Sequence, residues 1–389
     1  SIDSLGYFYA RITGLLGYKP NRHEGKITGL AAYGDPKVAN KLMKKMIHFD
    51  GSEIQANLGC YYRPFYRNYD PILVKEIKSF SKEQISAAAQ SHLEECLTSL
   101  VKSLFSKHNL PKMPLSIAGG VFGNVKVNQK LKELECITKI FVQPQMGDGG
   151  LSIGAACGSL SKRKMNVNFA NTMALGPKGG DEKLVKKLIG ENKDKYTLSK
   201  LSENDLIDNV VANLNKGEVI GLVRGKMEFG PRALCQRSIL YKTSDNTCND
   251  WLNKRMHRNE FMPFAPVMTN ENASKYLINY EKNDHSFKFM TCTSNVTSEF
   301  AELCPAVTHI DKTARPQVVS KKVDAWLWKL LTKWEKISGE PSLINTSFNQ
   351  HEEPIVCSYK DAIINLDNGT VDTLILDSFL IKKTNKEII

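Results

Sequence analysis

The sequence predicts an α/β fold, because one local pattern occurs twice in succession. An apolar stretch at 115–118 ends in two glycines and is followed by a helical pattern at about 123–133. The same order recurs with the apolar stretch 140–142 and a helical pattern from 151 to about 159. Strand, glycine turn and helix in this order are typical of α/β sheets, whose ligand loops lie at the carboxyl ends of the strands.

Length and composition define the class of protein. The chain has 389 residues, of which 41% are hydrophobic and 24% charged, as in an ordinary globular protein with room for two domains. No stretch approaches the roughly 18 apolar residues of a membrane span, and the N-terminus lacks the pattern of a signal peptide. Because the first residue is Ser1 and not Met, we expect a processed chain or a piece of a longer one.

Charge and cysteine usage bear on partners and compartment. The net charge of +12 favours anionic partners such as phosphorylated small molecules or nucleic acid, although lysines scattered over helix surfaces explain it equally well. The nine cysteines form no CxxC pair, which predicts reduced thiols in the cytoplasm and argues against a zinc ribbon.

The first part of the chain carries two further helical patterns. A basic one covers 37–48, and apolar residues recur at helical spacing from 82 to 108. Between them, the tyrosines of 61–69 either line an acceptor pocket or form a packed aromatic cluster, and the packed cluster is the favoured interpretation.

A basic, asparagine-rich and glycine-rich segment at 161–180 is the predicted linker, and it divides the chain into parts 1–160 and 181–389. In the second part we expect helices at about 181–190, 203–215 and 325–337, and a strand at 219–223. The tryptophans of 325–337 fall on one helical face, so they are predicted to belong to the core.

Two glycine turns in the first part are candidate ligand loops. Gly119 and Gly120 let a ligand approach the backbone, and Asn124 can hydrogen-bond a ribose or base, although a plain strand–helix turn explains the motif equally well. Asp148 lies among glycines after the next strand. It is either a metal or magnesium-phosphate contact or, slightly favoured, a helix N-cap.

The densest candidate site is the loop that follows the strand 219–223. It carries the cations Arg224, Lys226, Arg232 and Arg237, together with Glu228, which could orient an arginine or hold magnesium. Arginine offers paired donors to phosphate oxygens and lysine a point charge, so the loop predicts a phosphate-binding site more strongly than a basic surface loop.

Three later segments contribute further polar residues that could bind phosphate. They are 254–266, 306–318 and 341–349, and with the arginines they indicate a phosphate-rich substrate. The sequence contains no P-loop and no HExxH zinc motif.

Six ordered motifs resemble the carbamoyltransferase family of antibiotic and nodulation-factor O-carbamoyltransferases. They run from Glu24-Gly25-Lys26 to Gly34, from Gly119 to Asn124, from Gly147 to Ala156, from Gly225 to Leu240, from Thr308 to Val318 and from Pro341 to Asn349. The resemblance implies a partial domain of the actin, Hsp70 and sugar-kinase type over 1–160, followed by a YrdC-like α/β domain with a twisted mixed sheet over 181–389.

This resemblance also implies a reaction. In the C-terminal part, carbamoyl phosphate and ATP would give carbamoyl-adenylate and pyrophosphate, and the N-terminal part would pass the carbamoyl group to a hydroxyl of a sugar-like or natural-product acceptor. The expected cofactors are ATP, Mg²⁺ and an iron ion near the transfer site. Cations to neutralise the phosphates and a closed, dry cleft suit such chemistry.

The family implies roles for fifteen residues. The catalytic ones would be Arg232, Arg237, Lys226 and Glu228, and the metal ligand Asp148. Nucleotide or carbamoyl phosphate would be held by Arg224, Arg258, Arg315, Gln317, Asn345, Ser347, Asn349, Gly119, Gly120 and Asn124.

The sequence also departs from the family pattern. The HxxxH motif of the iron site is absent, and so is the first lobe of the N-terminal domain, so we expect a partner chain or a missing segment to supply both. Cys235 replaces the usual glycine, and Met256, Asn259 and Met262 replace a lysine, a glutamate and an arginine.

Two alternatives from other classes stay open. One is a nucleotide-binding subunit that needs a partner chain, and the other is a tRNA-modification component of the threonylcarbamoyl type. The family-like motif from Gly225 to Leu240 argues against the tRNA-modification alternative and against a nucleic-acid partner. No membrane partner is expected, and a homo-oligomer is compatible with the sequence.

Overall fold

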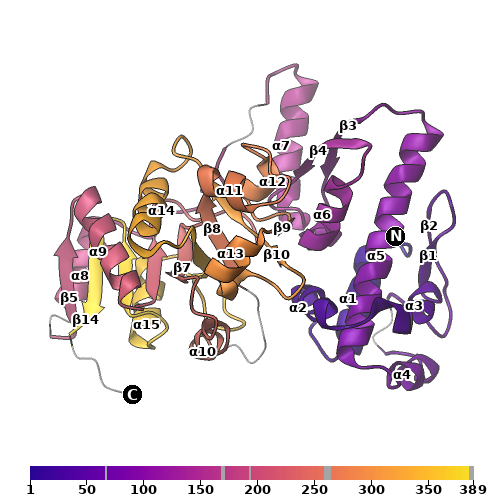
Figure 1. Ribbon diagram of the computed structural model, residues 1–389, viewed down its shortest axis with the longest axis horizontal. Helices are drawn as coiled ribbons and strands as arrows, with labels where there is room; N and C mark the ends of the chain where they lie inside the picture. Colours follow the sequence, from indigo (N-terminus) through magenta and orange to yellow (C-terminus); the bar gives the residue numbers. More distant parts are fainter. Residues whose placement is uncertain (66–67, 168–170, 192–193, 258–263, 385–389) are drawn as a thin grey trace. The chain divides into compact units, whose positions relative to one another are not determined.

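The computed structural model describes residues 1–65, 68–167, 171–191, 194–257 and 264–384 (Figure 1). The chain divides into two compact units. Unit 1 comprises Ser1–Asp148 with Thr291–Thr293, and unit 2 comprises Gly149–Met290 and Ser294–Ile389. The domain limits expected from the sequence stay a prediction, and the predicted linker 161–180 lies within unit 2.

Unit 1 is mostly helical. Its strands form two small sheets, an antiparallel pair β1–β2 and a parallel pair β3–β4. The strands are β1 (Ile47–Phe49), β2 (Ile54–Ala56), β3 (Met113–Ile117) and β4 (Ile137–Val142). The helices are α1 (Leu5–Leu15), α2 (Glu24–Leu30), α3 (Pro36–Lys44), α4 (Pro71–Ile77), α5 (Lys82–Lys107) and α6 (Val125–Lys132), with the 3₁₀ turns η1 (Ala31–Tyr33) and η2 (Gly120–Gly123).

Helix α5 is the central element of unit 1 and confirms the helix predicted at 82–108. Ser81 and Gln84 form a reciprocal capping box at its start. Its buried face includes Ile85, Leu93 and Cys96, which join the core of the unit. The basic helix predicted over 37–48 is wrong at its end, because the chain leaves α3 and pairs β1 with β2 instead.

The described tyrosines of the segment 61–69 pack against the core of unit 1, as the favoured interpretation predicts, and Tyr66 lies outside the described residues. Tyr62 is fully buried in the core, and the hydroxyl of Tyr69 donates to the backbone oxygen of Arg11 at 3.1 Å. The Arg11 guanidinium lies 3.8 Å from the centroid of the Tyr69 ring. Phe65 is exposed.

Unit 2 is built on one mixed sheet of eight strands, in the order β11-β8-β12-β7-β6-β13-β14-β5. Two neighbouring pairs, β11–β8 and β13–β6, are parallel, and the others are antiparallel. The predicted α/β class with a mixed sheet is therefore confirmed. The strands are β5 (Tyr196–Lys200), β6 (Ile220–Val223), β7 (Arg237–Lys242), β8 (Ala265–Thr269), β11 (Gln317–Val319), β12 (Ser342–Ser347), β13 (Thr373–Leu376) and β14 (Phe379–Lys383), with a separate pair β9 (Ser294–Asn295) and β10 (Thr313–Ala314).

The helices of unit 2 are α7 (Leu151–Lys162), α8 (Glu182–Gly190), α9 (Glu203–Asn215), α10 (Cys248–Arg255), α11 (Asn270–Tyr276), α12 (His285–Lys288), α13 (Ser298–Leu303), α14 (Ala325–Ser338) and α15 (Tyr359–Asp367), with the 3₁₀ turns η3 (Asp148–Gly150) and η4 (Pro305–Val307). Helices α9, α11, α12, α14 and α15 pack against this sheet (Figure 1). α8, α9 and α14 confirm the helices predicted for the second part.

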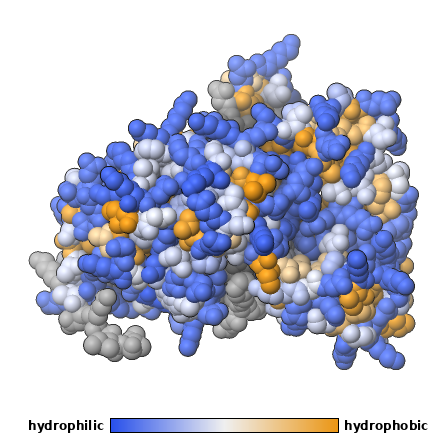
Figure 2. Space-filling view, viewed as in Figure 1, coloured by the Kyte–Doolittle hydropathy of each residue, from blue (hydrophilic) through white to orange (hydrophobic). Residues whose placement is uncertain are grey.

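The core of unit 2 lies where α9 and α14 meet the sheet. Trp334 of α14 is buried, and Trp326 and Trp328 pack partly buried against the same cluster, as predicted for core residues. The visible surface is mostly hydrophilic with scattered apolar patches (Figure 2). None of the helices among the described residues is both long enough and apolar enough to cross a membrane.

Candidate active site

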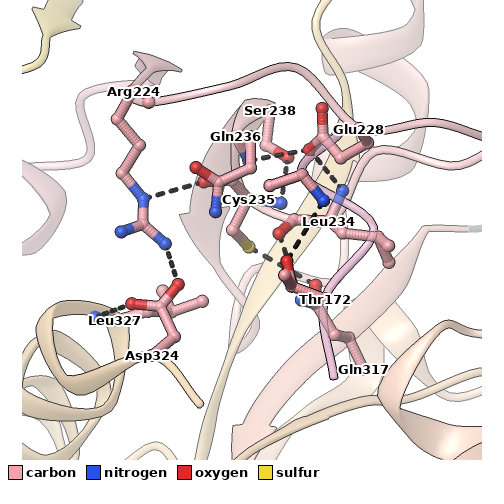
Figure 3. Close-up of polar contacts among 12 residues, drawn as sticks. Thr172, Arg224, Glu228, Leu234, Cys235, Gln236, Ser238, Gln317, Asp324 and Leu327 are labelled. Carbon is pink, nitrogen blue, oxygen red and sulfur yellow. Dashed lines mark hydrogen bonds and ion pairs between the residues drawn. The ribbon is translucent and has the colours of Figure 1, made fainter. Parts of the chain in front are cut away.

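The basic loop joins β6 to β7, and one carboxylate gives it its shape. Oε1 of Glu228 accepts hydrogen bonds from the backbone amides of Leu234 and Gln236, both at 2.7 Å, and of Arg237 at 3.1 Å (Figure 3). Glu228 is 7% exposed, and its Oε2 has no hydrogen-bond partner among the described residues. Burying a carboxylate is tolerated when backbone N–H groups satisfy it, so Glu228 organises the loop.

Arg237 is fully buried beneath this loop. Its guanidinium donates to five backbone carbonyls at 2.8–3.3 Å, those of Cys357, Arg224, Gln236, Pro177 and Gly225. Burial lowers the pKa of this guanidinium from its ordinary value. The structure thus gives Arg237 an organising role, and its predicted contact with substrate stays a prediction.

Arg224 also makes internal contacts. Its Nη2 forms an ion pair with Asp324, and its Nε donates to the backbone oxygen of Cys235 at 3.0 Å (Figure 3). The guanidinium carbon lies 4.8 Å from the centroid of the Trp326 ring. Asp324 in turn caps α14 by accepting from the amide of Leu327. Asp324 is a site residue that the sequence analysis missed, because an aspartate before a helix gives only an N-cap signal.

Arg232 and Arg315 form a pair of like charges. Both side chains are half-buried. Burial lowers the pKa of Arg315 to about 10, and burial and then the positive charge of Arg315 lower the pKa of Arg232. Arg315 has no hydrogen bond or ion pair with any residue that the structure describes. Two neighbouring cations held in this way are suited to a polyanion.

Lys226 lies on the exposed part of the same loop. Its backbone bridges to Lys178 of the segment that precedes α8. An exposed ammonium on a flexible stem can reach a phosphate by electrostatic attraction without a fixed geometry.

The polar residues of β11 and β12 lie under the loop. Asn345 Nδ2 donates to the backbone oxygen of Ala233 at 3.0 Å and to Oε1 of Gln317 at 2.6 Å. Gln317 Nε2 donates to the backbone oxygen of Leu234 at 3.2 Å. Asn345 Oδ1 is buried and has no hydrogen-bond partner among the described residues. The structure therefore brings Asn345 and Gln317 to the loop, where they support it.

Ser347 and Asn349 lie at and just after the carboxyl end of β12, and both are half-buried. Asn349 Nδ2 donates to the backbone oxygens of Gln350 and Glu353 at 2.8 and 2.9 Å. The predicted site residue Arg258 and the departures Asn259 and Met262 lie outside the described residues, and Met256 is buried.

Cys235 explains one departure from the family pattern. Its φ of +67° lies in the left-handed region, where glycine is the favoured residue. The cysteine keeps this conformation while its amide donates to Oγ of Ser238 at 2.9 Å and its thiol donates to Gln317 Oε1 at 3.4 Å. Burial raises the pKa of this thiol, which disfavours the nucleophilic thiolate form.

The segment 171–180, which we call the strap, pairs with the basic loop. The amides of Met227 and Phe229 donate to the backbone oxygens of Pro177 and Met173 at 2.8 and 2.7 Å. The amide of Gly176 donates back to Met227 at 2.9 Å. A Cβ at Gly176 would lie 3.0 Å from that backbone oxygen, so close packing accounts for this glycine. The sequence analysis interpreted the same glycines as a linker signal.

The strap and the loop enclose part of a cavity of about 150 Å³. Its walls include the strap residues Met173 and Ala174, and Glu228 and Gln236 of the loop. Other walls come from Leu234, Asn270, Lys288, Phe289, Gln317, Val318, Val319, Ser320, Val323, Asp324 and Leu327.

The glycine turns of unit 1 lie at the ends of β3 and β4, as predicted. The amide of Gly119 donates to the backbone oxygen of Met146 at 2.7 Å, which joins the two turns. Gly119 has a φ of +126°, and a Cβ at Gly120 or Gly147 would meet no atom within 4 Å. This open backbone is accessible to a ligand.

Asn124 is engaged within unit 1. Its Nδ2 donates to Gln90 Oε1 at 2.7 Å and to Thr28 Oγ1 at 3.3 Å, and its Oδ1 accepts from the amide of Val127 at 3.2 Å as the cap of α6. The hydroxyl of Tyr9 donates to the same Gln90 oxygen at 2.8 Å. Asn124 thus fixes the turn in place, and its predicted contact with adenosine stays a prediction.

Asp148 is exposed at the start of η3. The described residues contain no group of three or more His, Cys, Asp or Glu side chains that could hold a metal ion. Structural and catalytic iron or zinc sites take at least three protein ligands, so the described part of the chain does not form the expected iron site on its own.

Unit 2 is thus an α/β fold in which a loop rich in cations follows a strand of the sheet and adjoins a cavity, an arrangement suited to anionic ligands. A family model described as carbamoyltransferase N-terminus matches residues 1–157, and one described as carbamoyltransferase C-terminus matches residues 211–383. The chain belongs to the carbamoyltransferase family, as the six motifs predicted.

Relatives of this chain are longer than it is. An uncharacterized protein of Methanocaldococcus jannaschii is 35% identical over 98% of this chain and 73% of its own length. Nodulation protein NolNO of Sinorhizobium fredii is 32% identical over 98% of this chain and 56% of its own length. A solved structure of full-length HypF in the phosphate- and nucleotide-bound form is 19% identical, with a TM-score of 0.34 over 46% of this chain and 26% of that one. This last likeness is too weak to place any site.

Proposed function

We propose that this chain carries out the adenylating half of an ATP-dependent O-carbamoyl transfer. Carbamoyl phosphate and ATP would react in unit 2 to give carbamoyl-adenylate and pyrophosphate, and the carbamoyl group would then pass to a hydroxyl of a small-molecule acceptor. Atom balance requires one water molecule, which releases the phosphate of carbamoyl phosphate as inorganic phosphate. Mg²⁺ would enter with the nucleotide.

The observation that carries the proposal is the arginine pair Arg232 and Arg315. Burial lowers the pKa of both guanidinium groups, and the positive charge of Arg315 lowers that of Arg232 further, so an anion bound beside them would be stabilised. A triphosphate or pyrophosphate supplies that charge, and it forms paired hydrogen bonds with planar guanidinium groups. The same cations would stabilise the negative charge that develops on departing pyrophosphate.

The basic loop supplies the rigidity that such stabilisation needs. Glu228 and Arg237 satisfy backbone amides and carbonyls of the loop before any ligand arrives. Pre-formed donors need no reorganisation at the moment of reaction, which is where electrostatic catalysis gains its effect. In this role Glu228 and Arg237 are positioning residues.

The test is exchange of labelled pyrophosphate into ATP in the presence of carbamoyl phosphate. We expect the wild-type chain to exchange, Arg232→Ala to lose at least 100-fold, and Arg232→Lys to recover part of the loss. Arg163→Ala removes an exposed arginine outside the site and should exchange like wild type. A folded wild-type chain without exchange would refute the adenylation step.

A second candidate is a nucleotide-binding subunit that needs further polypeptide for transfer, and unit 1 favours it. None of the residues of β3 is buried, whereas parallel strands are normally covered on both faces. Under this proposal the chain by itself exchanges pyrophosphate into ATP. It carbamoylates a hydroxyl only when a longer polypeptide or a partner completes the transfer site. Carbamoylation by the 389-residue chain alone would contradict it.

A further inference from the structure

The turn between β13 and β14 lies where the basic loop begins. Leu376 of β13 pairs with Val223 of β6 in the parallel ladder, and the amide of the next residue, Asp377, donates to the backbone oxygen of Val223 at 3.0 Å. Asp377 has a φ of +49°, which aspartate adopts more readily than most residues in a tight hairpin. The hairpin therefore accounts for the backbone of Asp377, but it does not account for the direction of its carboxylate.

Both oxygens of this carboxylate accept hydrogen bonds from outside the hairpin. Oδ1 accepts from the amide of Gly225 at 2.7 Å, and Oδ2 accepts from the hydroxyl of Tyr359, the first residue of α15. Burial, and then the hydrogen bond and charge of Asp377, raise the pKa of Tyr359, so this hydroxyl stays protonated and remains a donor. Because charged acceptors make the stronger hydrogen bonds, Asp377 fastens the start of the basic loop to α15.

Gly225 is the residue of the loop start whose backbone has the most freedom. Its φ is +55°, and glycine adopts either sign of φ at little cost. Asp377 holds its N–H, and Nη2 of Arg237 donates to its carbonyl at 3.3 Å. These two side chains restrict Gly225 to one conformation, and loss of the carboxylate would release the backbone that precedes Lys226.

Tyr359 also supports the strap, which holds the loop on the other side of Lys226. Tyr359 is 2% exposed, and its amide donates to the backbone oxygen of Gly179 at 2.9 Å. A Cβ at Gly179 would lie 2.8 Å from the Tyr359 ring, so ring and strap are in close contact. The strap in turn accepts the amide of Met227 at Pro177, 2.8 Å away. One tyrosine thus joins the supports on both sides of Lys226.

From these contacts we infer that Asp377 and Tyr359 are positioning residues for the adenylation step, which act by fixing the backbone beneath Lys226. The stem of a lysine is flexible, so the backbone is what limits the region that its ammonium reaches. The inference rests on the proposed function, in which the cations of the basic loop attract the phosphates of the substrates. In this role neither positioning residue needs to contact a substrate.

The test removes the carboxylate without straining the hairpin. Asp377→Gly deletes both acceptors, and glycine tolerates the positive φ of this position. We expect kcat/KM for pyrophosphate exchange to fall about tenfold or more, because small displacements of a reacting group are costly. Asp377→Asn keeps an oxygen for the Gly225 amide, and its own amide can donate to the Tyr359 hydroxyl, so it should recover most of the loss. Tyr359→Phe keeps the ring against the strap and should lose about threefold.

Two further variants separate positioning from general stability. Ser378→Ala is the matched control, because Ser378 is the other residue of the turn and its side chain has no hydrogen bond with any described residue. It should exchange like wild type. In a Lys226→Ala background, Asp377→Gly should lower kcat/KM by less than about twofold, since the residue that it positions is gone.

Amide hydrogen exchange gives a readout that needs no activity. The peptide that contains Gly225 should exchange faster in Asp377→Gly than in wild type and in Asp377→Asn. Unchanged protection of this peptide, wild-type pyrophosphate exchange by Asp377→Gly, or its full loss in the Lys226→Ala background would each overturn the inference and leave the adenylation step intact. Equal losses in Asp377→Asn and Asp377→Gly would also overturn it. A folded wild-type chain without pyrophosphate exchange would refute the proposed function, and the inference would fall with it.

Discussion

The basic loop of unit 2 and the glycine turns of unit 1 follow the same local rule, since each begins where a strand ends. They differ in the charge of the side chains that hold them. Side chains hold the basic loop, because one oxygen of Glu228 binds three of its amides and Arg237 binds five carbonyls in and around it. A backbone bond from Gly119 to Met146 joins the glycine turns, a Cβ at Gly120 or Gly147 would meet no atom within 4 Å, and the neutral side chain of Asn124 fixes the first turn.

This difference separates two kinds of ligand site. A loop built from buried charges is rigid and presents fixed cations, which suits a reaction that needs electrostatic stabilisation. A turn of bare backbone presents N–H groups and little else, which suits the close approach of a ligand. We therefore expect substitutions in the basic loop to lower both the free energy of unfolding and the rate of pyrophosphate exchange. Substitutions near the glycine turns should lower the free energy of unfolding and leave the exchange rate unchanged.

The largest effect is expected at Glu228. Glu228→Ala leaves three amides without their acceptor at about 1–3 kcal/mol each, so the free energy of unfolding should fall by roughly 3 kcal/mol or more. Glu228→Gln keeps an oxygen for the amides and should lose less than half as much. Urea unfolding monitored by fluorescence measures both. Equal losses in the two variants would show that the amides do not depend on this acceptor.

An intermediate effect is expected from the pH dependence of stability. Acidification should remove the contribution of His285 in unit 2 and strengthen that of Glu94 in unit 1. Burial and the nearby charge of Lys288 lower the pKa of His285 to about 4, so its contribution to stability is present above its unfolded value of 6.5 and is lost as the pH falls toward 4. The full shift corresponds to about 3 kcal/mol, which partial exposure of the ring reduces to about 2 kcal/mol. Burial raises the pKa of Glu94, so its contribution is present at low pH and is lost as the pH rises above 4.5 through the raised value.

Unfolding at pH 8 and pH 4.5 checks these signs. Compared with wild type, His285→Gln should lose less stability on acidification and Glu94→Gln should lose more. The same change in both variants would contradict the assignment of opposite signs to the two groups.

The smallest effect is expected at Asn124. Asn124→Ala removes the cap of α6 and the bonds to Gln90 and Thr28, which should cost about 1–2 kcal/mol of stability. Pyrophosphate exchange should stay at the wild-type rate, because the arginine pair is in unit 2. Asn209→Ala, at an exposed position of α9, should change stability by less than about 0.5 kcal/mol. Loss of exchange in Asn124→Ala would contradict the separation of the two sites.

The elements with strong periodicity were predictable, and the partners of single side chains were not. Helix α5 follows from the spacing of its apolar residues and its Ser81 cap, and the positions of the glycine turns follow from the apolar stretches before them. Arg237 and Arg232 look alike in the sequence, yet one meets carbonyls and the other faces a second arginine. Which guanidinium N–H groups already have carbonyl acceptors depends on the folded path of the chain, and the local sequence does not reveal it.

The strap shows the same limit from another side. Glycines signal either freedom or close approach, and nothing in 171–180 distinguishes the two until Met227 and Tyr359 are seen against Gly176 and Gly180. Asp324 was missed for a similar reason, since its capping role is local and its ion pair with Arg224 joins residues a hundred positions apart.

Cys235 gives this protein an internal reporter of loop opening. Its sulfur is fully buried, and burial raises the pKa of the thiol, so a thiol reagent reaches it only when the basic loop separates from β11. The rate at which the thiol is modified would then measure how often the loop opens. Slower modification in the presence of a nucleotide would reveal ligand binding through a residue that takes no part in the chemistry.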